Sequence, residues 1–543
     1  MSRMNIKKVC LTFFLAASAA VPVLAAPPKL VVTILVDQMR YDYLERFGDQ
    51  FSTNGFRMLT ERGALMTFAR YDYAPTVTGP GHASFLSGST PAMHGIIANE
   101  WYDKRLKTNQ GCVQDLSVWG VGGASPTNGR SSPVNFIGAT FCDQMRLHYG
   151  SKVVGVSLKD RAAILPVGKQ PTGAYWIDAK SGNFITSTYY RKTLPEWVDR
   201  FNGEKRIASY AGKTWERMSD APAVSPALAS APQDPALHGS TGFPHRIAES
   251  AKDGALSFET TPLGNQLVVE FAEAAIEGES LGSTARPDVL SVSFSSTDLC
   301  GHKFGPYSPE MHEIMLSLDR QLESFFGYLD KRIGLSNIVV ALTADHGVCP
   351  TPEFAAAQGL AGENFDLAGK LVELTNKLSL KFGAGSYLLT TKDYEGNLYF
   401  NHSTMSQNHV TDEQMVSYIR EWAFDLGKIS AVYSREQLLG GNAPGLMGRL
   451  VLNGYNPERC GDMVLILKPF ILSGGSKGGT THGSPFNYDS HVPVIFYGTP
   501  FKTGRYAEVF NITDLAPTLC AALHVEEPPG CMGKPFVKAL LTP

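Results

Sequence analysis

Five short runs of apolar, mostly β-branched residues recur along the chain, and turn-forming residues bound each of them. They cover residues 30–36, 153–158, 289–294, 338–342 and 492–497. Apolar runs of this length are typical of strands buried on both faces of a parallel sheet, and helical patterns lie between several of them. This alternation predicts an α/β fold, a three-layer αβα sandwich around a mostly parallel central sheet.

The clearest helical pattern covers residues 308–332. Its apolar residues recur at the spacing of one helix face, at Met311, Ile314, Met315, Leu318, Leu322, Phe325, Phe326 and Leu329. The predicted strand 338–342 follows after a short loop that contains Gly334. We therefore assign this helix and strand to the expected sandwich.

We expect one catalytic domain over residues 26–543. The composition, with 18% charged and 43% hydrophobic residues, excludes collagen-like, coiled-coil and wholly disordered chains. Residues from about 165 to 263 differ from the rest, because a predicted hairpin at 175–190 precedes a passage rich in Ala, Pro and Ser. We interpret this stretch as an inserted cap region over the open end of the core.

The N-terminus has the pattern of a secretory signal peptide. A basic start precedes an apolar run over residues 9–24, and small residues, among them Val23 and Ala25, come before Pro27. Cleavage after Ala25 is predicted, which makes residues 1–25 the signal and the mature protein secreted or periplasmic. The alternative, a membrane anchor, is disfavoured because the run is short and is interrupted by Pro22.

Charge and cysteine content limit the partners of the mature chain. Removal of the signal leaves 45 basic and 51 acidic residues, a balance that argues against a nucleic-acid-binding surface. Seven cysteines remain, an odd number, and we expect Cys520 and Cys531 to pair because they bracket a turn-rich segment. We expect a monomer or a weak oligomer without a stable membrane anchor.

Acidic and imidazole side chains follow several of the predicted strands. They are Asp37 after the first strand, Asp298 and His302 after the third, Asp345 and His346 after the fourth, and His482 just before the last. Because the carboxyl ends of parallel strands share one edge of a sheet, where ligands bind, we expect these side chains to converge.

Three carboxylates and three imidazoles suit hard-to-borderline cations, and they divide into two sites that substrate or water would complete. Taken singly, a strand-end Asp is more often a helix cap, and an isolated Asp-His-Gly is more often a turn. Repetition of the pattern after several strands favours metal binding over these separate explanations.

Thr78 lies in a segment that predicts a tight turn followed by a helix. Gly79, Pro80 and Gly81 follow it, so its hydroxyl is expected near a helix N-terminus, where backbone N–H groups favour anions. Beside divalent cations such a hydroxyl is a nucleophile, whereas on its own it would be read as an N-cap. Asn99, after a second turn, is a candidate donor to a phosphoryl oxygen, or a loop-capping residue.

Lys159 and Arg161 follow the second predicted strand and alternate along the chain. Both are therefore expected to face the same edge of the sheet, where they would offer two cations to an oxyanion with more than one charge. The alternative is an ordinary solvated basic pair.

Together, these residues resemble the alkaline phosphatase superfamily, and within it the secreted bacterial PafA/PhoK-type enzymes with a threonine nucleophile. The resemblance covers nearly all of the mature chain. It implies two zinc ions, one held by Asp298, His302 and His482, and the other by Asp37, Asp345 and His346, with Thr78 Oγ on the second. It also implies hydrolysis of phosphate monoesters through a phosphothreonine.

Other activities fit the residues less well. A secreted phosphodiesterase of the nucleotide pyrophosphatase type shares the metal ligands, the threonine and the asparagine, and it is the alternative to a phosphatase. The sequence lacks the Cys-x-Pro-x-Arg motif of sulfatases and the Asp-Ser-Ala segment of serine-type alkaline phosphatases. A binding protein that has lost catalysis would be expected to lack the nucleophile or a metal ligand.

Overall fold

The computed structural model describes residues 27–218, 243–248, 256–474 and 478–541. The predicted signal peptide lies outside the described residues. The cysteines of the described part, Cys112, Cys142, Cys300, Cys349, Cys460, Cys520 and Cys531, are free thiols, so the expected pairing of Cys520 with Cys531 is absent.

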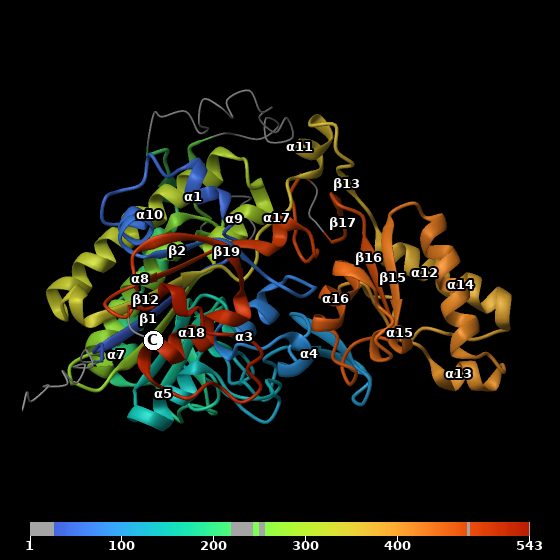
Figure 1. Ribbon diagram of the computed structural model, residues 1–543, viewed down its shortest axis with the longest axis horizontal. Coiled ribbons are helices and arrows are strands. Elements are labelled where there is room, and N and C mark those ends of the chain that lie inside the picture. Colours follow the sequence, from blue (N-terminus) through green and yellow to red (C-terminus); the bar gives the residue numbers. More distant parts are fainter. Residues whose placement is uncertain (1–26, 219–242, 249–255, 475–477, 542–543) are drawn as a thin grey trace, which may run out of the picture.

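A ten-stranded sheet forms the centre of the molecule (Figure 1). Its strands, in spatial order, are β19 (Gly504–Asn511), β2 (Ala64–Arg70), β18 (His491–Tyr497), β12 (Ile338–Thr343), β1 (Leu30–Val36), β11 (Asp288–Phe294), β6 (Val153–Ser157), β7 (Gly173–Asp178), β8 (Asn183–Ser187) and β5 (Gly120–Val121). All five strands predicted from apolar runs are present. β12, β1, β11, β6 and β7 run parallel, as expected.

The last predicted strand corrects one expectation, because β18 runs antiparallel to β12. Its apolar sequence could not reveal the direction, since burial on both faces produces the same pattern in either orientation. The reversal has a consequence for the site. The chain enters β18 at the edge where the parallel strands end, so the segment before it, which contains His482, reaches that edge.

Helices cover the sheet in two groups. α8 (Pro262–Glu279) packs against α10 (Pro309–Arg332) and against β6 and β11, whereas α3 (Thr78–Ser87), α5 (Phe141–Tyr149) and α18 (Leu515–Leu523) pack together. α10 confirms the helix predicted over 308–332, and Ser308 Oγ caps it by accepting a hydrogen bond from Met311 N at 3.0 Å. The predicted α/β sandwich is therefore correct.

The stretch from 165 to 263 divides between two structures. The predicted hairpin is β7 and β8, and it extends the central sheet rather than standing apart as a cap. After it, α7 (Glu196–Gly203) packs on α8, and β9 (Thr214–Trp215) pairs with β10 (His245–Arg246). That the rest of residues 165–263 covers the open end of the core remains a prediction.

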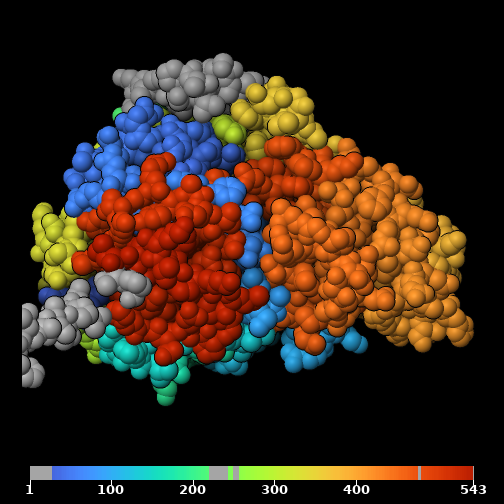
Figure 2. Space-filling model, viewed as in Figure 1, coloured from blue at the N-terminus to red at the C-terminus, as the bar shows by residue number. Residues whose placement is uncertain are grey.

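A second lobe lies beside the sandwich, coloured orange in Figures 1 and 2. Its own apolar core joins α12 (Leu367–Phe382), α14 (Asp412–Asp425) and a small sheet of β14 (Asn397–Leu398), β16 (Met463–Leu467) and β15 (Ile429–Ser434). The apolar patterns in the sequence did not predict this lobe. It is inserted between His346 and His482, so the chain leaves the sandwich after one predicted ligand and returns before another.

Candidate metal centre and active site

The predicted ligands converge at one edge of the central sheet. Asp37 directly follows β1, Asp298 lies in the first turn of α9 (Ser296–Phe304) after β11, and Asp345 follows β12. These three carboxylates are at most 3% exposed. Burial of three acids at one edge is costly unless cations neutralise them, so this placement itself points to a cation site.

Asp298, His302 and His482 form the first cluster with the spacing of metal ligands. His302 Nε2 lies 3.2 Å from Asp298 Oδ1, since both residues lie on α9 one turn apart. His482 Nε2, from the loop before β18, lies 3.7 Å from the same oxygen. This set is the one that the family resemblance implies for the first ion.

The second cluster surrounds His346. Asp37, Asp298 and His346 offer ligand atoms within 4.8 Å of one another. His346 Nε2 lies 3.5 Å from Asp37 Oδ1 and 3.4 Å from Asp345 Oδ2. The resemblance assigns Asp345 rather than Asp298 to this ion, and the geometry brings both carboxylates to the same place.

All three histidines present the same nitrogen to the site. Nδ1 of His302, His346 and His482 lies 2.9 Å from the carbonyl oxygen of Thr480, Gly347 and Thr76, respectively. A carbonyl only accepts, so Nδ1 carries the proton and the Nε2 lone pair faces the carboxylates. Metal-binding histidines are commonly oriented in this way.

The electrostatics of the carboxylates agree with a cation site. Burial, followed by the charges of Asp298 and Asp345, raises the pKa of Asp37 well above its ordinary value. Burial acts in the same direction on Asp298, but the charges of His302 and Lys159 outweigh it and lower the pKa of Asp298 well below its usual range. Burial, with His346 and His302, lowers the pKa of His482, which favours the neutral imidazole.

Two buried oxygens of the cluster, Asp37 Oδ1 and Asp345 Oδ2, accept no hydrogen bond. Orphaned carboxylate oxygens facing imidazole Nε2 atoms make a mixed oxygen and nitrogen donor set, which fits borderline divalent cations such as zinc. The residues present therefore fit the two metals that the family resemblance implies.

Thr78 lies beside the second cluster. It is the first residue of α3, as predicted, and its Oγ1 is 3.4 Å from His346 Nε2. The side-chain oxygen of Asn99 accepts a hydrogen bond of 2.7 Å from Gly79 N, at the start of the same helix. Because this hydrogen bond fixes the oxygen of Asn99, the Nδ2 group is left to donate a hydrogen bond to a bound ligand. The N-terminus of α3 therefore presents a hydroxyl and an amide close to the metal ligands.

The two basic residues take different positions. Lys159 Nζ lies 2.6 Å from Asp37 Oδ2 and 2.6 Å from Asp298 Oδ2, between two predicted metal ligands. Arg161 lines a cavity together with Asn99. Both residues follow β6, as expected, and Arg161 lies within α6 (Asp160–Ile164).

Two residues that the sequence analysis missed hold the carboxylates in place. Gln38 donates from Nε2 to Asp298 Oδ1 at 2.6 Å and from its backbone N to Asp345 Oδ1 at 3.1 Å. His82 Nδ1, one turn after Thr78, donates a hydrogen bond of 2.9 Å to Thr78 O and also lies 3.2 Å from Asp345 Oδ2, a contact that places the imidazole against this carboxylate. Gln38 is next to Asp37 in the sequence and His82 is four residues after Thr78, and this closeness could have identified them. Residues that orient metal ligands often lie near those ligands in the chain.

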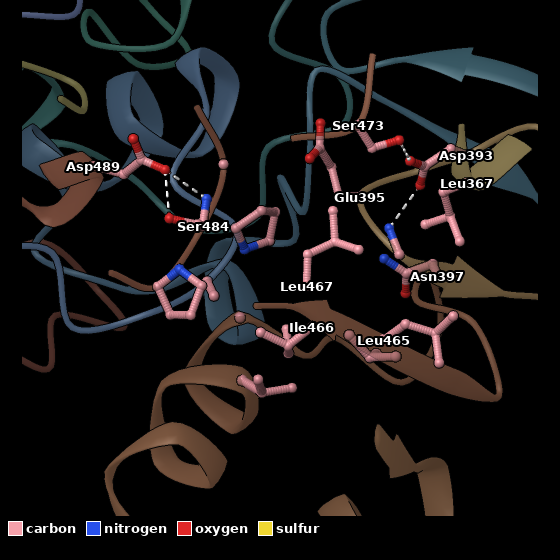
Figure 3. Close-up of a pocket in the computed structure, with 18 of the residues that line it drawn as sticks. Leu367, Asp393, Glu395, Asn397, Leu465, Ile466, Leu467, Ser473, Ser484 and Asp489 are labelled. Carbon is pink, nitrogen blue, oxygen red and sulfur yellow. Dashed lines mark hydrogen bonds between the residues drawn. The ribbon is translucent and has the colours of Figure 1, made fainter. Parts of the chain in front are cut away.

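The loop that carries His482 lines a pocket between the sandwich and the second lobe (Figure 3). Asp489 Oδ2 accepts hydrogen bonds from Ser484 N at 2.8 Å and Ser484 Oγ at 2.6 Å. In Figure 3 this pair lies opposite Asp393 and Asn397 of the second lobe. The segment before β18 is thus stabilised by hydrogen bonds between its own residues.

Comparison with known proteins places the chain in a family. The family model described as Type I phosphodiesterase / nucleotide pyrophosphatase matches residues 31–485. Alkaline phosphatase PafA of Elizabethkingia meningoseptica is 38% identical over 519 residues, which cover 94% of each chain. Alkaline phosphatase PhoV of Synechococcus elongatus is 36% identical over 540 residues, which cover 94% of this chain and 93% of PhoV.

A further relative, a Myroides odoratus protein named calcium-transporting ATPase, is 37% identical over 526 residues, which cover 94% of this chain and 95% of that protein. The crystal structure of wild-type PafA superposes with a TM-score of 0.86 at 36% identity, and covers 95% of this chain and 100% of PafA. A PafA variant with a Thr, an Asn, a Lys and an Arg replaced has the same TM-score, 0.86.

Within the described residues, no helix has both the length and the apolar character needed to span a membrane. The family model covers most of the chain, and PafA and PhoV each align with 94% of it. The protein therefore belongs to the Type I phosphodiesterase / nucleotide pyrophosphatase family, together with the alkaline phosphatases PafA and PhoV.

Proposed function

We propose that this protein is an alkaline phosphatase that hydrolyses phosphate monoesters at a two-zinc site through a phosphothreonine at Thr78. The observation that carries the proposal is the position of Thr78 Oγ1, at the start of α3 and 3.4 Å from His346 Nε2 within the ligand clusters. The names of PafA and PhoV support the same activity. The name of the Myroides relative also denotes phosphoryl hydrolysis, that of ATP.

Asp298, His302 and His482 would hold one ion, and Asp37, Asp345 and His346 the other. When bound, two such ions acidify a hydroxyl and stabilise charge on the entering and leaving oxygens of a displacement at phosphorus. The clusters share a carboxylate, Asp298, so the geometry suits two ions in one centre rather than two separate sites.

Thr78 Oγ1 would attack phosphorus as the bond from phosphorus to the ester oxygen breaks, releasing the alcohol. Water would then cleave the phosphothreonine, restoring the hydroxyl and releasing inorganic phosphate. Asn99 Nδ2 and the N-terminus of α3 would stabilise the phosphoryl oxygens, since donors at a helix start favour anions.

Preference for monoesters follows from Lys159 and Arg161. A monoester carries nearly two charges and three non-bridging oxygens, whereas a diester carries one charge and a second organic group. PafA supports these roles, because its crystallised variant replaces a Thr, an Asn, a Lys and an Arg that have the same separations as Thr78 and Asn99, and as Lys159 and Arg161. The alternative is a phosphodiesterase.

Substitution of Thr78 tests the nucleophile. We expect Thr78→Ala to lower kcat/KM for an aryl phosphate by at least about a thousandfold, and Thr78→Ser to retain more activity because it keeps the hydroxyl. Rapidly quenched wild-type protein should carry the mass of one phosphoryl group on the peptide that contains Thr78, and Thr78→Ala should carry none. Equal turnover by Thr78→Ala and wild type would reject the assignment.

Export is a separate part of the proposal. The predicted signal over residues 1–25 would direct the enzyme to the periplasm or the medium. Sequencing the N-terminus of the mature protein is expected to give Ala26 as the first residue, and an intact Met1 would contradict export through this signal.

A further inference from the structure

A cavity adjoins the proposed phosphoryl-binding residues on the side of Asn99 and Arg161. Gln114, Arg130 and Asp160 line it together with these two residues. Arg130 belongs to the segment between β5 and α5, which the sequence analysis did not connect with the site. The cavity therefore brings a third basic residue to the active site beside Lys159 and Arg161.

Both guanidinium groups in this cavity lack a partner. Neither Arg130 nor Arg161 makes a side-chain hydrogen bond or an ion pair with any residue that the structure describes, and the Nε of each is buried without an acceptor. A buried charged donor without an acceptor costs free energy, and an anion bound in the cavity would supply the missing acceptor. Lys159 differs, because its Nζ lies 2.6 Å from both Asp37 Oδ2 and Asp298 Oδ2.

The backbone and an aromatic ring hold Arg130 in position. Its guanidinium carbon lies 3.7 Å from the centre of the Trp119 ring, which restricts the plane of the group. Its carbonyl oxygen accepts a hydrogen bond of 3.0 Å from Asp115 N. A stacked guanidinium keeps its N–H edge free for bidentate binding of a carboxylate or phosphate.

Asp160 lines the cavity together with both arginines, but its carboxylate binds other groups than the two guanidinium groups. Its Oδ2 accepts a hydrogen bond of 2.9 Å from Ser131 Oγ, and its Oδ1 accepts one of 2.7 Å from Arg161 N. Among the described residues that line the cavity, Asp160 supplies the one carboxylate against two guanidinium groups. The excess positive charge favours an anion.

We propose that Arg130, in the cavity that Arg161 also lines, forms a subsite for a second anionic group of the substrate, and that Arg130 is a specificity residue. The group would be a carboxylate or a phosphate carried by the ester in addition to the phosphoryl group that is transferred. This inference rests on the proposed function, because it takes Asn99 and Arg161 as the residues that receive the transferred group.

Three phosphate esters with a three-carbon chain test the subsite: propyl phosphate, 3-(phosphonooxy)propanoate and propane-1,3-diol bisphosphate. We expect wild-type kcat/KM for at least one anionic ester to exceed that for the neutral ester by about tenfold or more, since charge-assisted pairs are strong. In Arg130→Ala this ratio should approach one, and Arg130→Lys should restore part of it. The preferred ester distinguishes a carboxylate from a phosphate.

Arg105→Ala is the matched control, because Arg105 is an exposed arginine of the neighbouring turn and does not line the cavity. It should leave the anionic-to-neutral ratio at the wild-type value. An equal fall of the ratio in Arg105→Ala and Arg130→Ala would attribute the preference to overall charge and overturn the proposal. A wild-type ratio of one for both anionic esters would also overturn it.

A binding measurement separates this proposal from the proposed function. Titration with propane-1,3-diol bisphosphate, in a Thr78→Ala background that does not hydrolyse it, should change the fluorescence of Trp119, which stacks on Arg130. Replacing Trp119 by Phe in the same background identifies the part of the signal that comes from this ring. We expect about tenfold weaker binding when Arg130→Ala is added to this background. Hydrolysis of none of the esters would reject the proposed function, whereas unchanged affinity in Arg130→Ala would reject the subsite.

Discussion

At the scale of single residues, the metal centre depends on side chains that would not touch a metal. His82 is fully buried, with Nδ1 at 3.2 Å from Asp345 Oδ2 and Nε2 at 2.8 Å from Ser293 Oγ. It therefore links the helix that begins with Thr78 to a ligand of the second cluster. Such supports orient the ligand and adjust its basicity.

We expect His82→Gln to lower metal affinity or activity by about 10- to 100-fold, the usual cost of removing the support of a ligand. Metal content after dialysis against a graded series of zinc buffers gives the affinity, and kcat measured at saturating zinc separates loss of metal from loss of chemistry. His148→Gln, at an exposed histidine of α5 outside the centre, is the control and should behave as wild type. Wild-type zinc affinity in His82→Gln would contradict the support role.

Sequence reasoning at this scale identified the acidic and imidazole side chains that the structure brings together, and it missed the residues that contact them. Asp37, Asp298, Asp345, His302 and His346 follow predicted strands, so the parallel topology brings them together. His482 precedes the last strand and reaches the same edge because β18 is antiparallel. Gln38 and His82 have no such pattern, because each acts through a contact with a residue more than 200 positions away in the chain. The cation site itself could be predicted, but the hydrogen bonds that orient it required coordinates.

At the scale of elements, the site depends on how closely α3 approaches the loop after β12. Gly81, in the first turn of α3, allows this approach, since a Cβ placed there would lie 2.3 Å from Asp345 O and 2.6 Å from Asp345 Cβ. A contact below 3.0 Å with backbone forces one element to move. Glycine is thus required for packing rather than for an unusual backbone angle.

Gly81→Ala is expected to shift Asp345 or Thr78 and to lower kcat/KM by about a hundredfold, since small misplacements of reacting groups are costly. Circular dichroism should still show the fold, because alanine favours a helix more than glycine does. Gly327→Ala in α10, where a Cβ meets nothing within 4 Å, is the matched control with unchanged activity. Full activity of Gly81→Ala would show that catalysis does not need the close contact between α3 and the loop after β12.

Elements differ in how well the sequence determines them. Buried strands and the amphipathic helix α10 were predictable because their apolar patterns are local. The antiparallel direction of β18 was not, since strand direction depends on the path of the chain between elements. The second lobe was missed because its core forms only when distant segments of the chain meet.

At the scale of the whole molecule, the ligands join segments from Asp37 to His482 across the sandwich and the insertion of the second lobe. Bound cations would neutralise three buried carboxylates that the folded state brings together and the unfolded chain keeps apart. Metal binding should therefore stabilise the fold, by about 2.7 kcal/mol at a free metal concentration one hundred times Kd.

Removal of metal by a chelator is expected to lower Tm and to abolish activity, and added zinc should restore both. Differential scanning calorimetry before and after chelation measures the change. Asp298→Ala, which removes a carboxylate common to both clusters, should show no further decrease in Tm with chelator, because it no longer binds the metals tightly. An unchanged Tm of the wild type on chelation would contradict a metal centre coupled to the fold.

Discrimination between monoesters and diesters tests the central claim most directly. The measurement is the ratio of kcat/KM for an aryl phosphate monoester to that for the matched diester, at mildly alkaline pH with zinc present. Our account predicts a ratio well above one in wild type and a clear fall in Arg161→Ala, because that cation faces the extra charge of the monoester. A wild-type ratio below one would contradict the account and identify the protein as a phosphodiesterase.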